Sequence, residues 1–174
     1  MKRKSFELAL SGIASAIAAL FLTLGTLNSY LLMTGYLFGT FAVMLPLARQ
    51  FPWGSAMTYV ASSLLSLLFG SIGYFWRLLP FLVFFGLHPV FNYFQVKKRW
   101  NRVVCFIVKA VWFDVMLYLV WRFVFGMMTN FPVLDAYMPW IMFPVGILLF
   151  YPYDYMMFRC QMSVDALVSR IRRR

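Results

Sequence analysis

Residues 77–102 read RLLPFLVFFGLHPVFNYFQVKKRWNR, and the other apolar segments of the chain can be oriented relative to this stretch. Its apolar run carries the only histidine of the chain, His88, directly before Pro89, and it ends in four cations between Lys97 and Arg102. Proline interrupts a helix because it lacks an N–H and its ring clashes with the preceding turn. Cations at the end of an apolar helix mark the cytoplasmic side of a membrane. The stretch therefore predicts a kinked membrane-spanning helix whose C-terminal end lies at the inner face.

The composition places the chain among membrane proteins. Hydrophobic residues make up 63% of the 174 residues and charged residues 12%, against about 45–50% and about 25% in soluble domains. A helical span needs roughly 20 residues, so the length suits one compact bundle of about six helices. We expect a single all-α transmembrane domain over residues 1–174, with no sizeable soluble domain.

The net charge of +11 would favour nucleic-acid binding in a soluble protein, but here the cations are grouped at membrane-flanking positions. They cluster at residues 2–4, 97–102 and 170–174. The positive-inside rule produces this pattern. We therefore expect contact with anionic membrane lipid and no nucleic-acid partner.

Six apolar segments are expected to cross the membrane as a six-helix bundle, at residues 6–27, 31–48, 53–68, 75–94, 103–125 and 140–158. With the N-terminus inside, nearly all cations fall on inner segments, and only Arg77 and Arg122 fall on or near the outer side. Both termini are therefore predicted to be cytoplasmic. Residues 127–139 are expected to form the longest external loop, and residues 159–174 a basic cytoplasmic tail.

The first expected span is rich in small residues at four-residue spacing, such as Ala14 with Ala18 and Gly12 with Ala16. This spacing lets two helices approach closely in lipid, where packing drives association. Two interpretations stay open. The small residues either pack within the bundle of this chain or form a docking face for another membrane subunit.

Three titratable residues fall deep inside the expected spans: His88, Asp114 and Asp154. Such residues are costly in a bilayer and usually face the bundle interior, a partner or water. His88 is interpreted as a neutral, hydrogen-bonded histidine, as a ligand contact or as a group with a proton-coupled role. Asp114 has His88, Lys109 and Arg122 as possible partners. Asp154 is expected to contact a cytoplasmic partner or the inner cations.

Catalytic chemistry has little support in the sequence. The chain shows no nucleophile with a base at a suitable spacing, no paired carboxylates, no glycine-rich phosphate loop and no Cys/His metal spacing. These are the motifs that would indicate an enzyme or a metal centre. We therefore expect no catalytic residue, no metal site and no cofactor.

Residues 85–92, FGLHPVFN, are followed by Lys109 near the start of the next span. The pair resembles the run FGxxPxxK and the lysine-bearing fifth span of a known family. That family is the substrate-binding S components of energy-coupling factor (ECF) vitamin transporters, and the closest resemblance is to the uncharacterised S-component-like membrane proteins of Firmicutes. Six short spans with both ends inside and a small-residue first helix fit the same pattern. Asn92 departs from it, because the family has a lysine there.

The resemblance implies a substrate-binding subunit of an importer for a small solute such as a vitamin, in the plasma membrane of a bacterium. Its partners would be a transmembrane coupling subunit and two ATPases. An Ala-xxx-Ala pattern in the first helix, here Ala14 and Ala18, would dock on the coupling subunit. The ligand would lie in the outer half of spans 4 to 6, under the loop that joins spans 1 and 2.

An outer pocket of that kind would be lined by aromatic and polar residues near the outer ends of the spans. These residues are Asn28, Tyr30, Trp76, Arg77, Trp121, Arg122, Asn130, Asp135 and Trp140. Aromatic walls with a few polar groups suit a small planar ligand, and the two arginines could hold a carboxylate or phosphate. The alternative is that the same residues form an interfacial aromatic belt.

A second class of function stays open. The chain could be a non-transporting membrane scaffold or assembly partner, as the similarly folded rod-shape protein MreD is thought to be. A ligand-sized outer cavity would favour the binding subunit, whereas a filled bundle would favour the scaffold.

Overall fold

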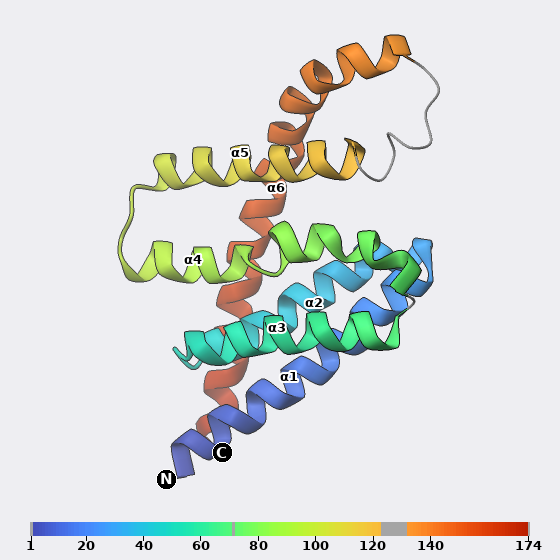
Figure 1. The fold of residues 1–174 in the computed structure, drawn as a ribbon. Helices are drawn as coiled ribbons and strands as arrows, with labels where there is room; N and C mark the ends of the chain where they lie inside the picture. The colour runs from blue at the N-terminus through green and yellow to red at the C-terminus, as the bar shows by residue number, and fades with distance from the viewer. Residues whose placement is uncertain (1, 71, 123–131, 174) are drawn as a thin grey trace.

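The computed structural model describes residues 2–70, 72–122 and 132–173, and all regular structure in these ranges is helical (Figure 1). The elements are α1 (Lys2–Leu27), η1 (Ser29–Leu31), α2 (Leu32–Leu47), α3 (Pro52–Phe69), η2 (Ile72–Leu78), η3 (Phe81–Phe85), α4 (His88–Lys97), α5 (Arg102–Val120) and α6 (Pro132–Arg173). The predicted all-α class is confirmed for the described ranges.

Four of the described helical segments are long and apolar enough to cross a membrane. They cover Ser5–Leu27, Ser29–Leu47, Arg102–Val120 and Trp140–Val168, and they indicate a membrane-embedded protein. The helix α3 is not among them, because serines make it less apolar, and neither is the segment from η2 to α4, because it is broken into short pieces. The six-span topology stays a prediction.

Successive helices alternate in direction, which gives the molecule two ends (Figure 1). The connections from α1 to α2 and from α3 to η2 lie at one end, called here the Arg77 end. The connections from α2 to α3 and from α4 to α5 lie at the other, called the Lys97 end. The helix α6 crosses the others obliquely.

The stretch that contains Pro89 is broken more strongly than a kink would require. A π-helical turn over Phe81–Phe85 is followed by a turn at Gly86, and α4 then begins at His88 with Pro89 in its first turn. A proline is tolerated in the first helical turn, where the missing N–H has no intrahelical partner in any case. Pro89 therefore starts a new helix.

The last helix corrects one prediction. The external loop expected at residues 127–139 is helical from Pro132 onward. The basic tail expected from residue 159 continues α6 to Arg173, which gives a helix of 42 residues. A proline in the first turn favours helix initiation. The three further prolines in α6 fit a membrane helix, where neighbouring groups can satisfy the backbone carbonyls that proline frees.

Small residues pack α1 against α2 and α3. Hydroxyl groups on α3 donate to backbone carbonyls of the neighbouring helices, from Thr58 to Ser11 at 3.2 Å and from Ser66 to Ala19 at 3.3 Å. A Cβ atom on Gly35 of α2 would lie 2.7 Å from the carbonyl oxygen of Phe21 on α1. The backbones of these three helices are therefore in near contact, and we call α1–α3 the small-residue half.

Large aromatic rings pack the other half, which consists of η3, α4, α5 and α6 and is called here the aromatic half. Phe84 is fully buried at its centre, with ring centroids 5.1 Å from Phe113 and 6.0 Å from Phe150. Edge-to-face and offset aromatic pairs at such distances are favourable. These rings form a buried core between η3, α5 and α6.

Candidate ligand-binding site

A cavity of about 800 Å³ lies toward the Arg77 end, between α2, α5, α6 and the η2–η3 segment. Pockets that take drug-sized molecules span roughly 300–1,000 Å³. Phe85 forms part of its wall, with its ring 5.3 Å from the Tyr36 ring on α2 and 5.5 Å from the Tyr153 ring on α6. This part of the molecule is therefore not a filled bundle.

The lining of this cavity is almost entirely apolar or aromatic. Its described lining residues are Ser29, Leu32, Met33, Tyr36, Leu37, Trp76, Arg77, Pro80, Phe85, Phe113, Met116, Leu117, Val120, Leu149, Tyr153 and Met156. Arg77 is the one member of this set with a formal charge at neutral pH. The cavity therefore offers mainly apolar surface and a single guanidinium.

Arg77 is fixed at the cavity by three neighbours. Its Nη1 donates to the carbonyl oxygen of Thr26 at 2.9 Å, and its guanidinium carbon lies 4.4 Å from the ring centre of Tyr74 and 5.1 Å from that of Trp76. Thr26 is in the last turn of α1, where backbone carbonyls carry partial negative charge. A guanidinium has five N–H donors, so an arginine anchored in this way can also bind an anion.

Two of the nine predicted ligand residues, Trp76 and Arg77, lie at the cavity. Asn28 instead caps η1 by accepting a hydrogen bond from the Tyr30 backbone, and Tyr30 itself is 96% exposed.

Trp121, Arg122 and Trp140 lie outside the lining of either cavity described here: Arg122 is exposed, and Trp140 is 80% exposed. An interfacial belt accounts better for these side chains. Asn130 and the side chain of Asp135 lie outside the described part of the chain.

A second, smaller cavity of about 420 Å³ lies at the Lys97 end, between α2, α4 and α6. Lys97 and Asp165 both contribute to its lining, so it carries a cation and an acid together. We assign the candidate ligand site to the larger cavity. Its volume suits a small molecule, and its one charged residue, Arg77, suits a ligand with an anionic group.

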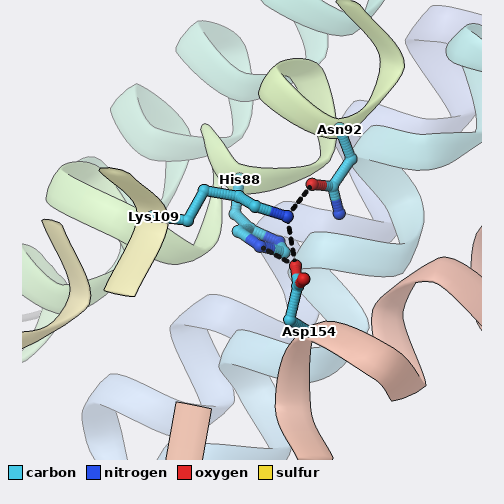
Figure 2. Close-up of polar contacts among 4 residues, drawn as sticks. All are labelled: His88, Asn92, Lys109 and Asp154. Carbon is cyan, nitrogen blue, oxygen red and sulfur yellow. Dashed lines mark hydrogen bonds and ion pairs between the residues drawn. The ribbon is translucent and has the colours of Figure 1, made fainter. Parts of the chain in front are cut away.

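A buried polar cluster joins α4, α5 and α6 through His88, Asn92, Lys109 and Asp154 (Figure 2). The Lys109 ammonium donates to the Asp154 carboxylate at 2.5 Å and to the Asn92 side-chain oxygen at 3.0 Å, and it lies 4.7 Å from the ring centre of Phe158. The His88 Nε2 lies 3.0 Å from the same carboxylate oxygen. A carboxylate only accepts hydrogen bonds, so Nε2 is the nitrogen that donates.

Burial makes this cluster important for stability. His88, Asn92 and Lys109 are fully buried and Asp154 is 8% exposed. An isolated charge at this depth is very costly, whereas a charge that is paired and hydrogen-bonded is tolerated. The structure thus decides between the partners that the sequence left open. Lys109 and His88 contact Asp154 and not Asp114. Asp154 contacts a lysine inside the helix bundle.

The cluster and the cavity share a wall of aromatic rings. The His88 ring lies 5.2 Å from the ring of Tyr153, which lines the cavity and directly precedes Asp154 in α6. Among the described residues, the His88 Nδ1 and the Tyr153 hydroxyl are buried without a hydrogen-bond partner. Tyr153 contacts the His88 ring and is the residue before Asp154 in α6. A change in the position of Tyr153 would therefore also move the Asp154 carboxylate.

Asp114 lies apart from this cluster, at the contact between α5 and α6. Its side chain faces Gly146, where a Cβ atom would overlap its Oδ1. The residue is 4% exposed, and neither carboxyl oxygen has a hydrogen-bond partner among the described residues. Glycine at position 146 is the residue that lets α6 approach this carboxyl group.

Ala14 and Ala18 are both fully buried by other parts of the chain itself. Packing within the bundle accounts for them, and in this arrangement neither side chain is available to a coupling subunit. Gly12 and Ala16 lie on the opposite, exposed face of α1, and a Cβ atom on Gly12 would meet no atom within 4 Å.

Searches of the chain against models of known protein families, against curated proteins and against solved structures each returned no match. Function is therefore inferred from the cavity and the polar cluster.

Most residues that line the cavity could not be recognised as site residues from the sequence. Leu117, Met116 and Leu149 are ordinary apolar residues of membrane helices, and only the packing of distant segments makes them a lining. Asn92 is different. It departs from the FGxxPxxK pattern in the sequence, and its side chain accepts a hydrogen bond from Lys109 in the structure.

Proposed function

We propose that this chain is a membrane-embedded binding protein that captures a small ligand in the cavity at the Arg77 end. In this proposal it has six spans with both termini in the cytoplasm of a bacterial cell, so that the Arg77 end lies at the outer side of the plasma membrane. It would serve as an S-component-like subunit that hands the ligand to a transmembrane coupling subunit driven by ATPases.

The cavity is the observation that carries this proposal. A membrane scaffold needs surfaces for partners and has no requirement for a cavity of about 800 Å³ beside a fixed arginine. A ligand of matching shape would gain dispersion contacts with the apolar lining. This gain supports capture as the role.

The binding role is tested by native mass spectrometry of the protein purified in detergent. Leu149 is 56% exposed and lines the cavity, so Leu149→Trp places an indole at the cavity without displacing the core. Leu148→Trp is the matched control, because Leu148 is 73% exposed and does not line the cavity. We expect a co-purified small molecule with the wild type and Leu148→Trp, and its loss from Leu149→Trp.

A repeated absence of any small molecule, together with a stably bound partner protein, would contradict the binding role and favour the scaffold. A bound molecule that is retained equally by Leu149→Trp would also count against the cavity as the site.

A further inference from the structure

We propose that the ligand of the larger cavity is a membrane-partitioned amphiphile, with an apolar body and one anionic group, that enters from the bilayer and not from water. This inference rests on the proposed function and narrows the class of the ligand. Three features of the cavity carry it: its lining, its rim and the position of its single charge.

The lining is too apolar for a water-soluble solute with many polar groups. The wall on α5 consists of Phe113, Met116, Leu117 and Val120. A ligand with several hydroxyl, amide or carboxylate groups would leave most of them without partners against such a wall, and each unsatisfied polar group costs affinity. Apolar contact is what these four side chains offer.

The rim of the cavity is also apolar. Met33 on α2, Leu149 and Met156 on α6 line the cavity and are 64%, 56% and 40% exposed. Both Met33 and Leu149 belong to helices that are apolar and long enough to cross a membrane, so their exposed sides face hydrocarbon. A molecule dissolved in the bilayer can therefore reach the cavity between α2 and α6 without passing through water.

Arg77, the one charged residue of the lining, lies at the end of the cavity where the anionic headgroup of a bound amphiphile would lie. Ser29 and Arg77 occur at the connections of the Arg77 end, whereas Phe85 and Tyr153 lie further along the helices toward the Lys97 end. An amphiphile in a bilayer keeps its charged group at the interface and its tail in the interior. The cavity has the same polarity, with a guanidinium at its interfacial end and aromatic rings at the deep end.

Trp76 supplies an optical probe at the charged end. The protein is placed in nanodiscs of zwitterionic phosphatidylcholine and titrated with stearate that carries a nitroxide quencher either near the carboxylate or at the far end of the chain. The fluorescence lost in the wild type but not in Trp76→Phe reports on Trp76 alone. We expect saturable quenching of Trp76, stronger with the nitroxide near the carboxylate than with the nitroxide at the far end.

Charge recognition is tested with Arg77→Met and Arg122→Met. A charge-assisted hydrogen bond at this position is expected to change affinity about tenfold. Arg77→Met should therefore weaken binding of unlabelled stearate, measured by competition, by about tenfold and leave binding of octadecanol unchanged. Arg122→Met should bind both like the wild type, because Arg122 is exposed and does not line the cavity.

Partition of the probes into the bilayer is controlled with Leu149→Trp and Leu148→Trp, each compared with the same variant carrying Trp76→Phe as well, so that the quenching of the added indole cancels. Leu149→Trp should lose the saturable quenching of Trp76, and Leu148→Trp should keep it. Quenching that is equal in Leu149→Trp and the wild type would overturn the amphiphile proposal. If native mass spectrometry then still finds a water-soluble solute that Leu149→Trp loses, the binding role stands and only the ligand class is wrong. If no bound molecule of either kind depends on Leu149, both proposals fall.

Discussion

The small-residue half and the aromatic half of this protein solve the problem of packing helices in a membrane in opposite ways. In the first half, a glycine on α2 lies so close to α1 that a Cβ atom would come within 2.7 Å of a backbone oxygen. In the second, helices are spaced by rings such as Phe84 and Phe113. The larger cavity lies where the two halves meet, between α2 on one side and η2, η3, α5 and α6 on the other.

The two halves also place their polar groups differently. Hydroxyl groups in the small-residue half donate to backbone carbonyls, as Ser55 does to Val43 at 2.9 Å, and they carry no charge. The aromatic half buries an ammonium and a carboxylate, Lys109 and Asp154, together with His88. The charged cluster ties α4, α5 and α6 together next to the cavity.

The largest expected effect comes from breaking the charged cluster. Asp154→Leu leaves the Lys109 ammonium buried without its carboxylate, and the loss of one partner of a buried ion pair costs about 3–5 kcal/mol. The free energy of unfolding can be measured by titration with sodium dodecyl sulfate in mixed micelles. The double variant Lys109→Met/Asp154→Leu should recover most of the loss, because it leaves no unpaired charge.

Asp165→Leu is the control for this comparison, since Asp165 is an exposed acid on the same helix and should change stability by less than about 0.5 kcal/mol. A loss below about 1 kcal/mol for Asp154→Leu would contradict the role of the cluster.

The next largest effect is expected in the small-residue half. Ala14→Leu adds a bulky side chain to the buried face of α1 and should destabilise the isolated protein by about 3 kcal/mol. Ala16→Leu is the matched control, because Ala16 is exposed two residues away on the same helix. The same detergent titration measures both. Equal stability of the two variants would show that α1 does not pack inside the chain through Ala14.

A smaller effect is expected where α5 meets α6. Gly146→Ala places a Cβ atom against Asp114, and such overpacking should cost about 1–2 kcal/mol. Asp114→Ala/Gly146→Ala removes the overlapping carboxyl group, so it should be more stable than Gly146→Ala alone. If the second substitution brings no recovery in thermal unfolding, Asp114 does not face Gly146.

The smallest expected effect links the cavity to stability. A ligand present at about five times its Kd should stabilise the wild type by about 1 kcal/mol, because it binds only the folded state. Stearate should therefore raise the thermal unfolding midpoint of the wild type and of Leu148→Trp, relative to octadecanol at the same concentration. The midpoint of Leu149→Trp should not respond, and an equal response would mean that stearate acts through the bilayer.

Local patterns were sufficient to predict the all-helical class, the apolar character of the chain and the break near Pro89. The grouping of cations at Lys97 to Arg102 also gave the direction of the helices in the prediction. These features depend on composition, on proline chemistry and on neighbouring residues. Only the helical start of α6 was not predicted, because prolines and polar residues in this part of the sequence are typical of a loop.

The site itself depends on distances that no local pattern encodes. Arg77 and Arg122 are equivalent in sequence, since both are arginines near the outer ends of expected spans. Only the fold brings Arg77 to the carbonyl of Thr26, 51 positions away, and beside the cavity. Similarly, the sequence favoured Asp114 as the partner of Lys109, because both lie on the same expected span, whereas the fold brings Lys109 to Asp154 on α6, 45 positions away.

The most direct test of the central claim is to locate a bound amphiphile in crystals of the protein. A stearate with bromine at its far end can be found by anomalous scattering. We predict a bromine peak in the cavity near Phe85 and Met116, with the carboxylate density toward Arg77. An empty cavity, or bromine peaks only on the lipid-facing surfaces of the helices, would contradict the assignment of this cavity as the ligand site.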